Sequence, residues 1–171
     1  MNFEIKKLKV HPDMSEETLA FSAELWIEGK KAVHVSNDGR GGCHLPRPFD
    51  AGGGKLLREL QAYAKTLPAV VYHGRSLDMD LDMLLDDRIE RMQMEKSLTR
   101  MMKGKVFWME NGKMYERKAK GVPEQRVVID SVLQKYPGVS ILNIVPMAQA
   151  VDIWLKWERK QQEEKAKQPV A

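Results

Sequence analysis

The chain has 171 residues, which is enough for one domain that buries about two-thirds of its unfolded surface without a metal or disulfide. A hydrophobic fraction of 43% and a charged fraction of 30% exclude wholesale disorder. The single cysteine, Cys43, excludes an internal disulfide and a cysteine-based zinc site, which favours a reducing, cytoplasmic setting. No signal-like segment or membrane-length apolar run occurs, so we expect no membrane partner. The net charge of +4 permits an anionic partner without requiring one.

The first part of the chain predicts β-structure. Apolar residues between Asn2 and Val10 change parity at Lys6 and Lys7, as in a strand with a bulge. The segment from Phe21 to Ile27 alternates strictly between apolar and other residues, and a tight turn leads to a second alternating run that ends at Ser36. We therefore predict a hairpin with one face on a core.

The segment from Ser36 to Lys55, SNDGRGGCHLPRPFDAGGGK, carries half of the chain's twelve glycines and its only cysteine. It is too rich in glycine and proline for regular structure, so we expect an irregular connector. Helical spacing of apolar residues then predicts an amphipathic helix from Lys55 to Leu67 that covers the apolar face of the hairpin. Val70–Tyr72 would add a short strand.

The second part of the chain predicts helices around another hairpin. A helix is expected from Asp80 to Lys103; its apolar stripe weakens after Met92, so its end would be exposed or pack on a partner. Asn111 and Gly112 predict the turn of a hairpin spanning 105–118, because both central residues of a type I′ turn need positive φ. Further helices are predicted over 124–136 and from Pro146 onward, the last ending in a solvated charged tail.

These elements predict a single α+β domain over residues 1–171. Its N-terminal antiparallel β-hairpin sheet would be covered by a helix, and a mostly helical part with a second hairpin would follow. A shift in composition near Leu77 allows two subdomains, 1–76 and 77–171.

The glycine-rich segment is the first candidate site. Consecutive glycines let backbone amides converge on a phosphate, and a helix start adds partial positive charge. The segment lacks the spacing of a Walker A loop and of a dinucleotide-binding loop, and a surface loop with turn glycines is the alternative. Its two glycine clusters could enclose one anion only if the fold brings Arg40 within reach of Gly54. The candidate ligand-binding residues are Asn37, Asp38, Gly39, Arg40, Gly41, Gly42, His44, Arg47, Gly53, Gly54 and Lys55.

Catalytic chemistry finds little support in the sequence. Cys43 and His44 are neighbours that would point to opposite sides of an extended segment, so a Cys/His pair needs His11, His34 or His73 instead. An unreactive cysteine at a loop edge is the alternative. We predict no catalytic residue and no cofactor.

Metal binding is also not predicted. Asp78, Asp80 and Asp82 resemble the start of a calcium loop, but Met83 and Ile89 stand where glycine and glutamate are needed. Acidic residues that open a helix explain this cluster better. The histidines match no metal motif.

A basic region is the second candidate site. Between Arg88 and Arg126, eleven Lys or Arg residues accompany five Glu residues. Positive charges alternate with aromatic rings in the second hairpin, which is a pattern that nucleic-acid binding uses. A solvated basic face is the alternative, and neither an RNP motif nor a helix-turn-helix is evident. The candidate nucleic-acid-binding residues are Lys105, Trp108, Lys113, Arg117 and Lys118.

The order FSAELWIEGKKAVHVSNDGRGGCH, two strands followed by NDGRGGCH, resembles a recurrent N-terminal block of small uncharacterised proteins of phages and mobile elements. The resemblance covers residues 3–67. It implies an accessory role, such as neutralising a host defence, and it assigns no activity or functional residue.

We therefore expect a non-enzymatic binding protein with an anionic partner, a nucleotide or a nucleic acid. In this hypothesis Arg40, Arg47 and Lys55 neutralise a phosphate held by the glycine-rich loop. One alternative is an inhibitor or adaptor that contacts a host protein through Met92–Met102 and the C-terminal tail. The other is a small hydrolase that uses Cys43 or the aspartate cluster.

Overall fold

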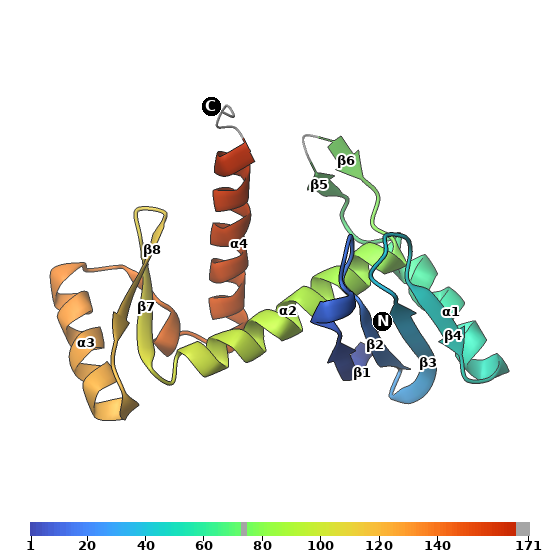
Figure 1. Cartoon of the computed structure of the whole chain (residues 1–171), viewed down its shortest axis with the longest axis horizontal. Coiled ribbons are helices and arrows are strands. Elements are labelled where there is room, and N and C mark those ends of the chain that lie inside the picture. The colour runs from blue at the N-terminus through green and yellow to red at the C-terminus, as the bar shows by residue number, and fades with distance from the viewer. Residues whose placement is uncertain (73–74, 167–171) are drawn as a thin grey trace. The chain divides into compact units, whose positions relative to one another are not determined.

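The computed structural model describes residues 1–72 and 75–166 and shows a mixed α+β protein (Figure 1). The chain divides into two compact units, Met1–Ile89 and Glu90–Ala171, and the boundary falls inside α2 (Leu81–Met101). The predicted α+β class, with an antiparallel N-terminal sheet and a helix that covers it, is confirmed. The subdomain boundary expected near Leu77 stays a prediction.

The first unit is built on an antiparallel sheet in the order β1–β2–β3–β4. Glu28 and Gly29 form the turn of the predicted hairpin, with φ of 50° and 74°, and the hairpin is confirmed. The predicted bulge is also confirmed, because the register shifts between Lys6 and Lys9, and Lys7 has φ 52°. The strands are β1 (Phe3–Val10), β2 (Phe21–Ile27), β3 (Lys30–Asn37) and β4 (Leu45–Pro48).

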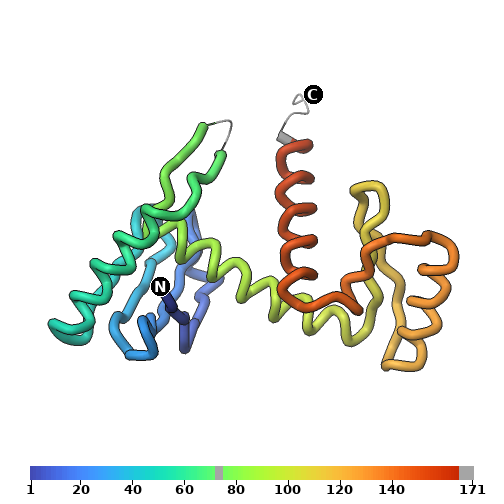
Figure 2. Tube along the Cα trace, turned by 180° about the vertical axis from the view of Figure 1, so that it is seen from behind, coloured from blue at the N-terminus to red at the C-terminus, as the bar shows by residue number. Residues whose placement is uncertain are grey.

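Two helices bury one face of this sheet. α1 (Ala51–Ala64) contacts β2, β3 and β4 (Figure 2), and α2 places the guanidinium of Arg88 over the ring of Phe3 at 5.3 Å. The sheet and these helices form the two layers that a small domain needs to exclude water from a core. The buried helix residues are Leu57, Leu60, Ala64, Leu81, Leu85 and Ile89.

The opposite side of the sheet, which we call the open face, carries no helix among the described residues of Met1–Ile89. Its side chains alternate with the buried ones along each strand, and none of them is fully buried. The register aligns one residue from each strand in a row across this face: Lys6, Glu24, His34 and Arg47.

The expectation of an irregular connector from Ser36 to Lys55 is wrong in its second half. Leu45–Pro48 forms β4, an edge strand, where the missing amide hydrogens of Pro46 and Pro48 can be tolerated. Helix α1 begins at Ala51 rather than near Lys55, because the carboxylate of Asp50 caps it by accepting a hydrogen bond from Gly53 N at 2.7 Å.

A separate hairpin of β5 (Val70–Tyr72) and β6 (Arg75–Leu77) follows α1. β5 is the short strand that the sequence predicts, whereas β6 was not predicted. Residues 73 and 74 lie outside the described residues, so the candidate pairing of His73 with Cys43 falls there too.

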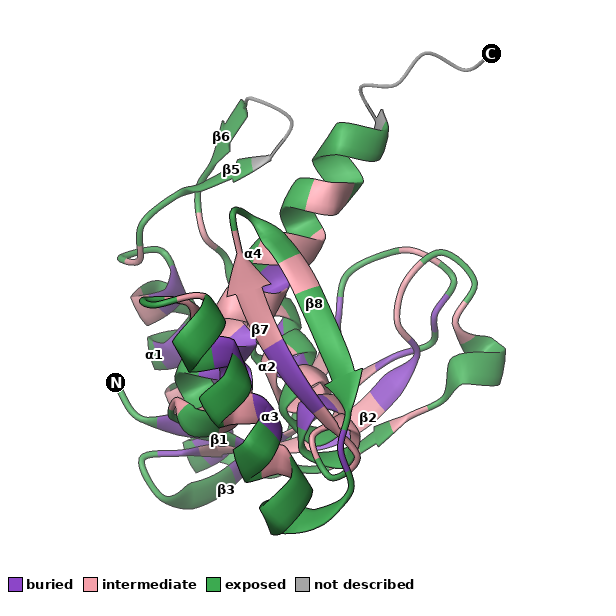
Figure 3. Cartoon of the chain, turned by 90° about the vertical axis from the view of Figure 1, so that its left-hand side faces the viewer, coloured by how far each residue is buried: buried purple, intermediate pink, exposed green. Residues whose placement is uncertain are grey.

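The second unit contains an antiparallel sheet in the order β8–β7–β9. The predicted hairpin is confirmed, and Asn111 and Gly112 have the positive φ angles, 49° and 75°, that its turn needs. β8 is exposed along most of its length (Figure 3). The elements are β7 (Lys105–Glu110), β8 (Lys113–Lys118), α3 (Gly121–Lys135), β9 (Ser140–Ile141) and α4 (Met147–Ala166).

Two apolar clusters hold this unit together. Val106 and Ile141 pack with α3, and Phe107 packs with α4 and the second half of α2. Met94, Met101 and Met102 lie against the second cluster. The expectation that α2 is exposed or binds a partner after Met92 is therefore wrong, because α4 supplies the apolar surface that its weak stripe meets.

The predicted helices over 124–136 and from Pro146 correspond to α3 and α4, and α3 begins a few residues earlier than expected. Residues 167–171, the end of the predicted tail, lie outside the described residues. None of the helices in the described ranges is long and apolar enough to cross a lipid bilayer.

Candidate functional site

The glycine-rich loop after β3 is closed by hydrogen bonds within the chain. Asn37 is buried, and its Oδ1 accepts from Thr18 Oγ1 at 3.0 Å and from Gly39 N at 2.8 Å. Its Nδ2 donates to Gly42 O at 3.2 Å. The amide of Gly41 also donates to Thr18 Oγ1. The amides of Gly39, Arg40 and Gly41 are therefore bonded within the protein and are not directed together at one ligand.

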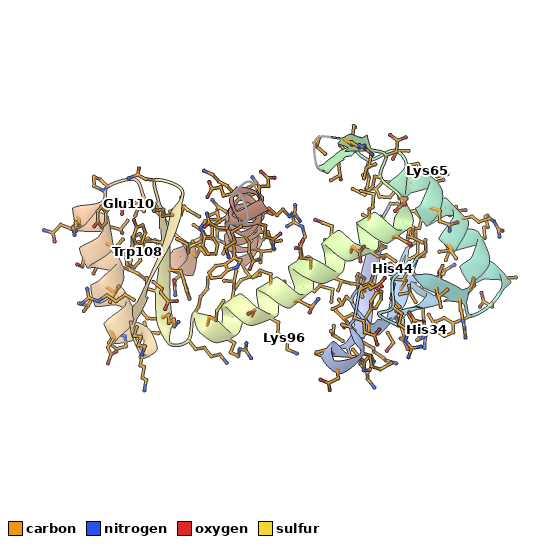
Figure 4. The ribbon with its side chains drawn as sticks, turned by 45° about the horizontal axis from the view of Figure 1, so that its top comes forward. His34, His44, Lys65, Lys96, Trp108 and Glu110 are labelled. Carbon is orange, nitrogen blue, oxygen red and sulfur yellow. The ribbon has the colours of Figure 1, made fainter. Side chains whose placement is uncertain are left out.

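His44 joins this loop to α2. The Nδ2 group of Asn37 faces His44 Nδ1 at 3.1 Å, and because Oδ1 of Asn37 already accepts two hydrogen bonds, Nδ1 must be the acceptor. The ring proton is then on Nε2, which donates to Asp86 Oδ1 at 3.0 Å. Asp82 accepts from the backbone amide of His44 at 3.1 Å. Figure 4 shows His44 beside α2.

The surroundings of His44 act on its charge in opposite directions. Burial lowers the pKa of His44, but the hydrogen bond to Asp86 and the charges of Asp86, Asp82 and Asp80 outweigh burial and raise that pKa. A second proton would enter on Nδ1, where Asn37 presents a donor, so charging the ring requires the Asn37 amide to turn. The charge of His44 is thereby linked to the order of the glycine-rich loop.

Replacing Asp86 by asparagine should lower the pKa of His44, because the neutral amide removes both the ionic hydrogen bond and the nearest negative charge. An NMR titration of the His44 ring protons measures this change. The exposed carboxylate of Asp13 provides the control, and Asp13→Asn should leave the His44 titration where it is. A His44 pKa that is equal in wild type and Asp86→Asn would contradict the assignment.

Cys43 is exposed but is not activated as a nucleophile. The carboxylate of Asp82 next to its thiol, with the charge of Asp80, raises the pKa of Cys43 and disfavours the thiolate. Both ring nitrogens of His44 are engaged elsewhere, so that histidine does not serve Cys43 as a base. This geometry gives no support to a cysteine-dependent hydrolase.

The aspartates at the start of α2 have local roles. Asp80 Oδ1 accepts from Met83 N at 2.9 Å, which caps the start of the helix, and Asp82 binds the His44 amide. Within residues 1–72 and 75–166, no group of three or more His, Cys, Asp or Glu side chains is placed to hold a metal ion.

The two glycine clusters lie at opposite ends of the β3–β4 pair. Ser36 pairs with Leu45 at one end, and Phe49 N donates to Ala32 O at the other. Ala32 and Ser36 are four residue steps apart along β3, which corresponds to about 13 Å. Arg40 is at the first end and Gly53, Gly54 and Lys55 are at the second. The single site that would join them is not formed.

The start of α1 instead borders a pocket of about 390 Å³. Three basic residues, Lys30, Lys31 and Lys55, line this pocket. Two acidic residues, Asp50 and Glu59, also line it. The amides of Ala51 and Gly52 precede the first intrahelical bond and have no hydrogen-bond partner in the described part of the chain. The lining residues are Lys30, Lys31, Asp50, Gly52, Gly53, Lys55, Leu56 and Glu59.

Some charged residues around this pocket are paired within the described part of the protein and others are not. Asp50 is used as the helix cap, and Glu59 lies 3.9 Å from Lys55. Lys31 pairs with Glu24 at 2.8 Å, whereas Lys30 makes no ion pair with any described residue. Sequence reasoning missed Lys30 and Lys31, although their position directly after the hairpin turn places them at the sheet end to which β4 returns.

The predicted nucleic-acid-binding residues do not share one surface. The register of β7 and β8 puts Trp108, Lys113 and Arg117 on the side of α3, and puts Lys105 and Lys118 on the other side. Trp108 packs against the α3 cluster and stacks on Tyr115 at 5.7 Å. Lys105 pairs with Glu116 at 2.7 Å. The hairpin therefore offers no continuous row of free charges and rings.

The fold and these contacts define an α+β protein with a closed polar loop at one end of its first sheet and a lysine-lined pocket at the other. Comparison with protein-family models, with curated proteins and with solved structures gives no match.

Proposed function

We propose that the protein is a non-enzymatic binding protein whose partner is anionic, a nucleotide or a nucleic-acid phosphate, bound at the start of α1. The observation that carries the proposal is the convergence of three lysines, Lys30, Lys31 and Lys55, on one pocket beside two unbonded helix amides. Ammonium groups and the amides of a helix N-terminus both favour a phosphate.

This proposal is narrower than the one that the sequence suggests. Lys55 and the glycines of the helix start remain in the site, and Lys30 and Lys31 join them. Arg40 and the loop from Asn37 to Gly42 are left out because they lie at the other end of the sheet. The resemblance to phage and mobile-element proteins supplies the biological setting of the proposal, an accessory or counter-defence role.

The double variant Lys30→Gln/Lys55→Gln should bind nucleoside triphosphate about tenfold more weakly, at roughly 0.7 kcal/mol for each solvent-exposed ion pair lost. Isothermal titration calorimetry at low salt measures the affinity. The matched control Lys65→Gln/Lys96→Gln removes the same charge from exposed helix positions outside the pocket and should bind as the wild type does. Equal losses in both double variants would show that only the net charge matters, and no loss in either would reject the pocket.

One observation favours a second candidate, contact with a host protein. The β5–β6 hairpin exposes apolar side chains, with Val71 at 72% and Leu77 at 43% exposure. The segment Met92–Met102, from which the sequence predicts this function, supports it less, because Met94, Met101 and Met102 pack inside the second unit. A stoichiometric protein partner retained after nuclease treatment would favour this candidate over the anion-binding one.

A further inference from the structure

We infer that the anionic partner is a single-stranded nucleic acid that crosses the open face of the β1–β4 sheet and reaches the α1 pocket at Lys31. This inference rests on the proposed function and names its ligand class. It is carried by the register of the four strands, which brings basic side chains from segments far apart in the sequence onto one face.

Three cross-strand rows make up the open face. The central row runs from Lys6 on β1 to Arg47 on β4 and spans three strand spacings, about 14 Å. The row beside it contains Lys9, and the row on the other side contains Trp26 and Lys31. Cations therefore lie at both edges of the sheet and along its length. A phosphate backbone that crosses the sheet would meet a cation at each of these positions.

The charge of this face is positive after its acidic residues are counted. Its cations exceed its two carboxylates, those of Glu4 and Glu24, by three. Glu24 is held between Lys31 at 2.8 Å and Lys7 at 3.0 Å; the hydrogen bonds from these lysines lower the pKa of Glu24 to about 2, so it is ionised under all ordinary conditions. The cations are Lys6, Lys7, Lys9, Lys31 and Arg47.

Trp26 gives the face a flat ring for a base. It lies near the end of the inner strand β2, beside the hairpin turn, and is the one tryptophan of Met1–Ile89; the ammonium of Lys6 is 3.9 Å from its ring centroid. Aromatic rings beside cations are what sequence-tolerant binding of single strands uses, because every base has a face that can stack. Lys6 is exposed and pairs with Glu4 at 3.1 Å, so a base that stacks on Trp26 would displace its ammonium from the ring and leave it at the surface for a phosphate.

Two buried polar atoms on the same face lack partners. In the described part of the chain, neither Trp26 Nε1 nor Glu24 Oε2 makes a hydrogen bond. Buried polar atoms are normally satisfied, so these two leave an acceptor and a donor to be supplied by water or by a ligand.

The face fits a single strand better than a duplex. A duplex presents its phosphates but keeps its bases stacked inside, where Trp26 cannot reach them. A lone nucleotide would use the pocket but not the cations at Lys6, Lys9 and Arg47. Lys31 connects the two surfaces, since it borders the pocket and also binds Glu24 on the open face.

The test measures fluorescence anisotropy of labelled single-stranded DNA and RNA of about 15 nucleotides, and of the matching duplex. The face variant is Lys6→Gln/Lys9→Gln/Arg47→Gln, and the control Lys65→Gln/Lys96→Gln/Lys103→Gln removes equal charge elsewhere. We expect the face variant to bind single strands at least tenfold more weakly, with a salt slope smaller by about 2, and the control to bind as the wild type. Circular dichroism verifies that each variant is folded.

A second measurement locates the strand. Tryptophan emission should be quenched when the wild type binds, and Trp26→Phe should lose most of that quenching because the other tryptophans lie in the second unit. Unchanged quenching in Trp26→Phe would overturn the placement on the open face. Comparing the affinities for single-stranded DNA and single-stranded RNA shows which of these two nucleic acids the open face binds more tightly.

The outcomes separate this inference from the proposed function. If the wild type binds nucleoside triphosphate through Lys30 and Lys55 but binds no single strand, or binds the duplex more tightly, the inference fails and the proposed function stands. A face variant with wild-type strand affinity likewise overturns the inference. If neither nucleotide nor strand binds to the wild type, both fail.

Discussion

Asn37→Ala should lower the free energy of unfolding by about 3 kcal/mol or more, because it removes an acceptor and two donors and leaves several buried groups without partners. Asn37 is 5% exposed and bonds to Thr18, Gly39, Gly42 and His44. Chemical denaturation measures the change. The loss of unfolding free energy should be far larger than for an ordinary surface substitution, because the Asn37 side chain alone connects both ends of the loop.

Ser36→Ala is the matched control for Asn37→Ala. Ser36 precedes Asn37 on β3, points to the open face, and has a hydroxyl with no hydrogen bond in the described structure. Its replacement should change stability by less than about 0.5 kcal/mol. Similar losses in the two variants would mean that the end of β3, and not the Asn37 network, determines stability there.

Gly39→Ala should cost about 4 kcal/mol, whereas Gly42→Ala should cost about 1–2 kcal/mol. Both glycines have positive φ, 85° and 113°, so both variants introduce backbone strain. Only at Gly39 would the added Cβ collide with the Met14 carbonyl oxygen and approach Ala20 Cβ to 2.9 Å. The difference between the variants therefore isolates the steric clash.

Thermal unfolding followed by circular dichroism compares the two glycine variants. If Gly42→Ala is the more destabilising, the close approach at Gly39 does not limit the loop. The pair also tests why the segment is rich in glycine. Stability lost at Gly39 with ligand affinity retained by the folded protein would assign this glycine to packing.

The elements with regular periodicity could be predicted from the sequence. Strict alternation identified the β2–β3 hairpin, and the Asn111–Gly112 turn identified the second one. β4 gave no such signal, because two of its four residues are prolines and the pattern has no clear alternation. The start of α1 could not be predicted because it contains three consecutive glycines, which have poor helix propensity. The helix begins there because Asp50 caps it and because only glycine at position 53 can approach Ala32 so closely.

The candidate site was predictable only in part, for a related reason. Asn37 and His44 were singled out in the right segment, but their partners Thr18 and Asp86 are distant in the sequence. A glycine cluster looks the same whether its backbone approaches a ligand or another strand. The direction of β4 separates the two clusters, and without that strand the sequence could not show that Lys30 rather than Arg40 accompanies Lys55.

The bond between His44 and Asp86 joins positions 42 residues apart, and this has a consequence for the order of folding. The β2–β3 hairpin needs only local contacts, which form early because little chain must be closed. The loop after β3 cannot reach its final form until the first turns of α2 dock. We therefore expect fraying of those turns in the native state to loosen the loop at His44 as well, so that the two segments open together although half of the first unit's chain lies between them.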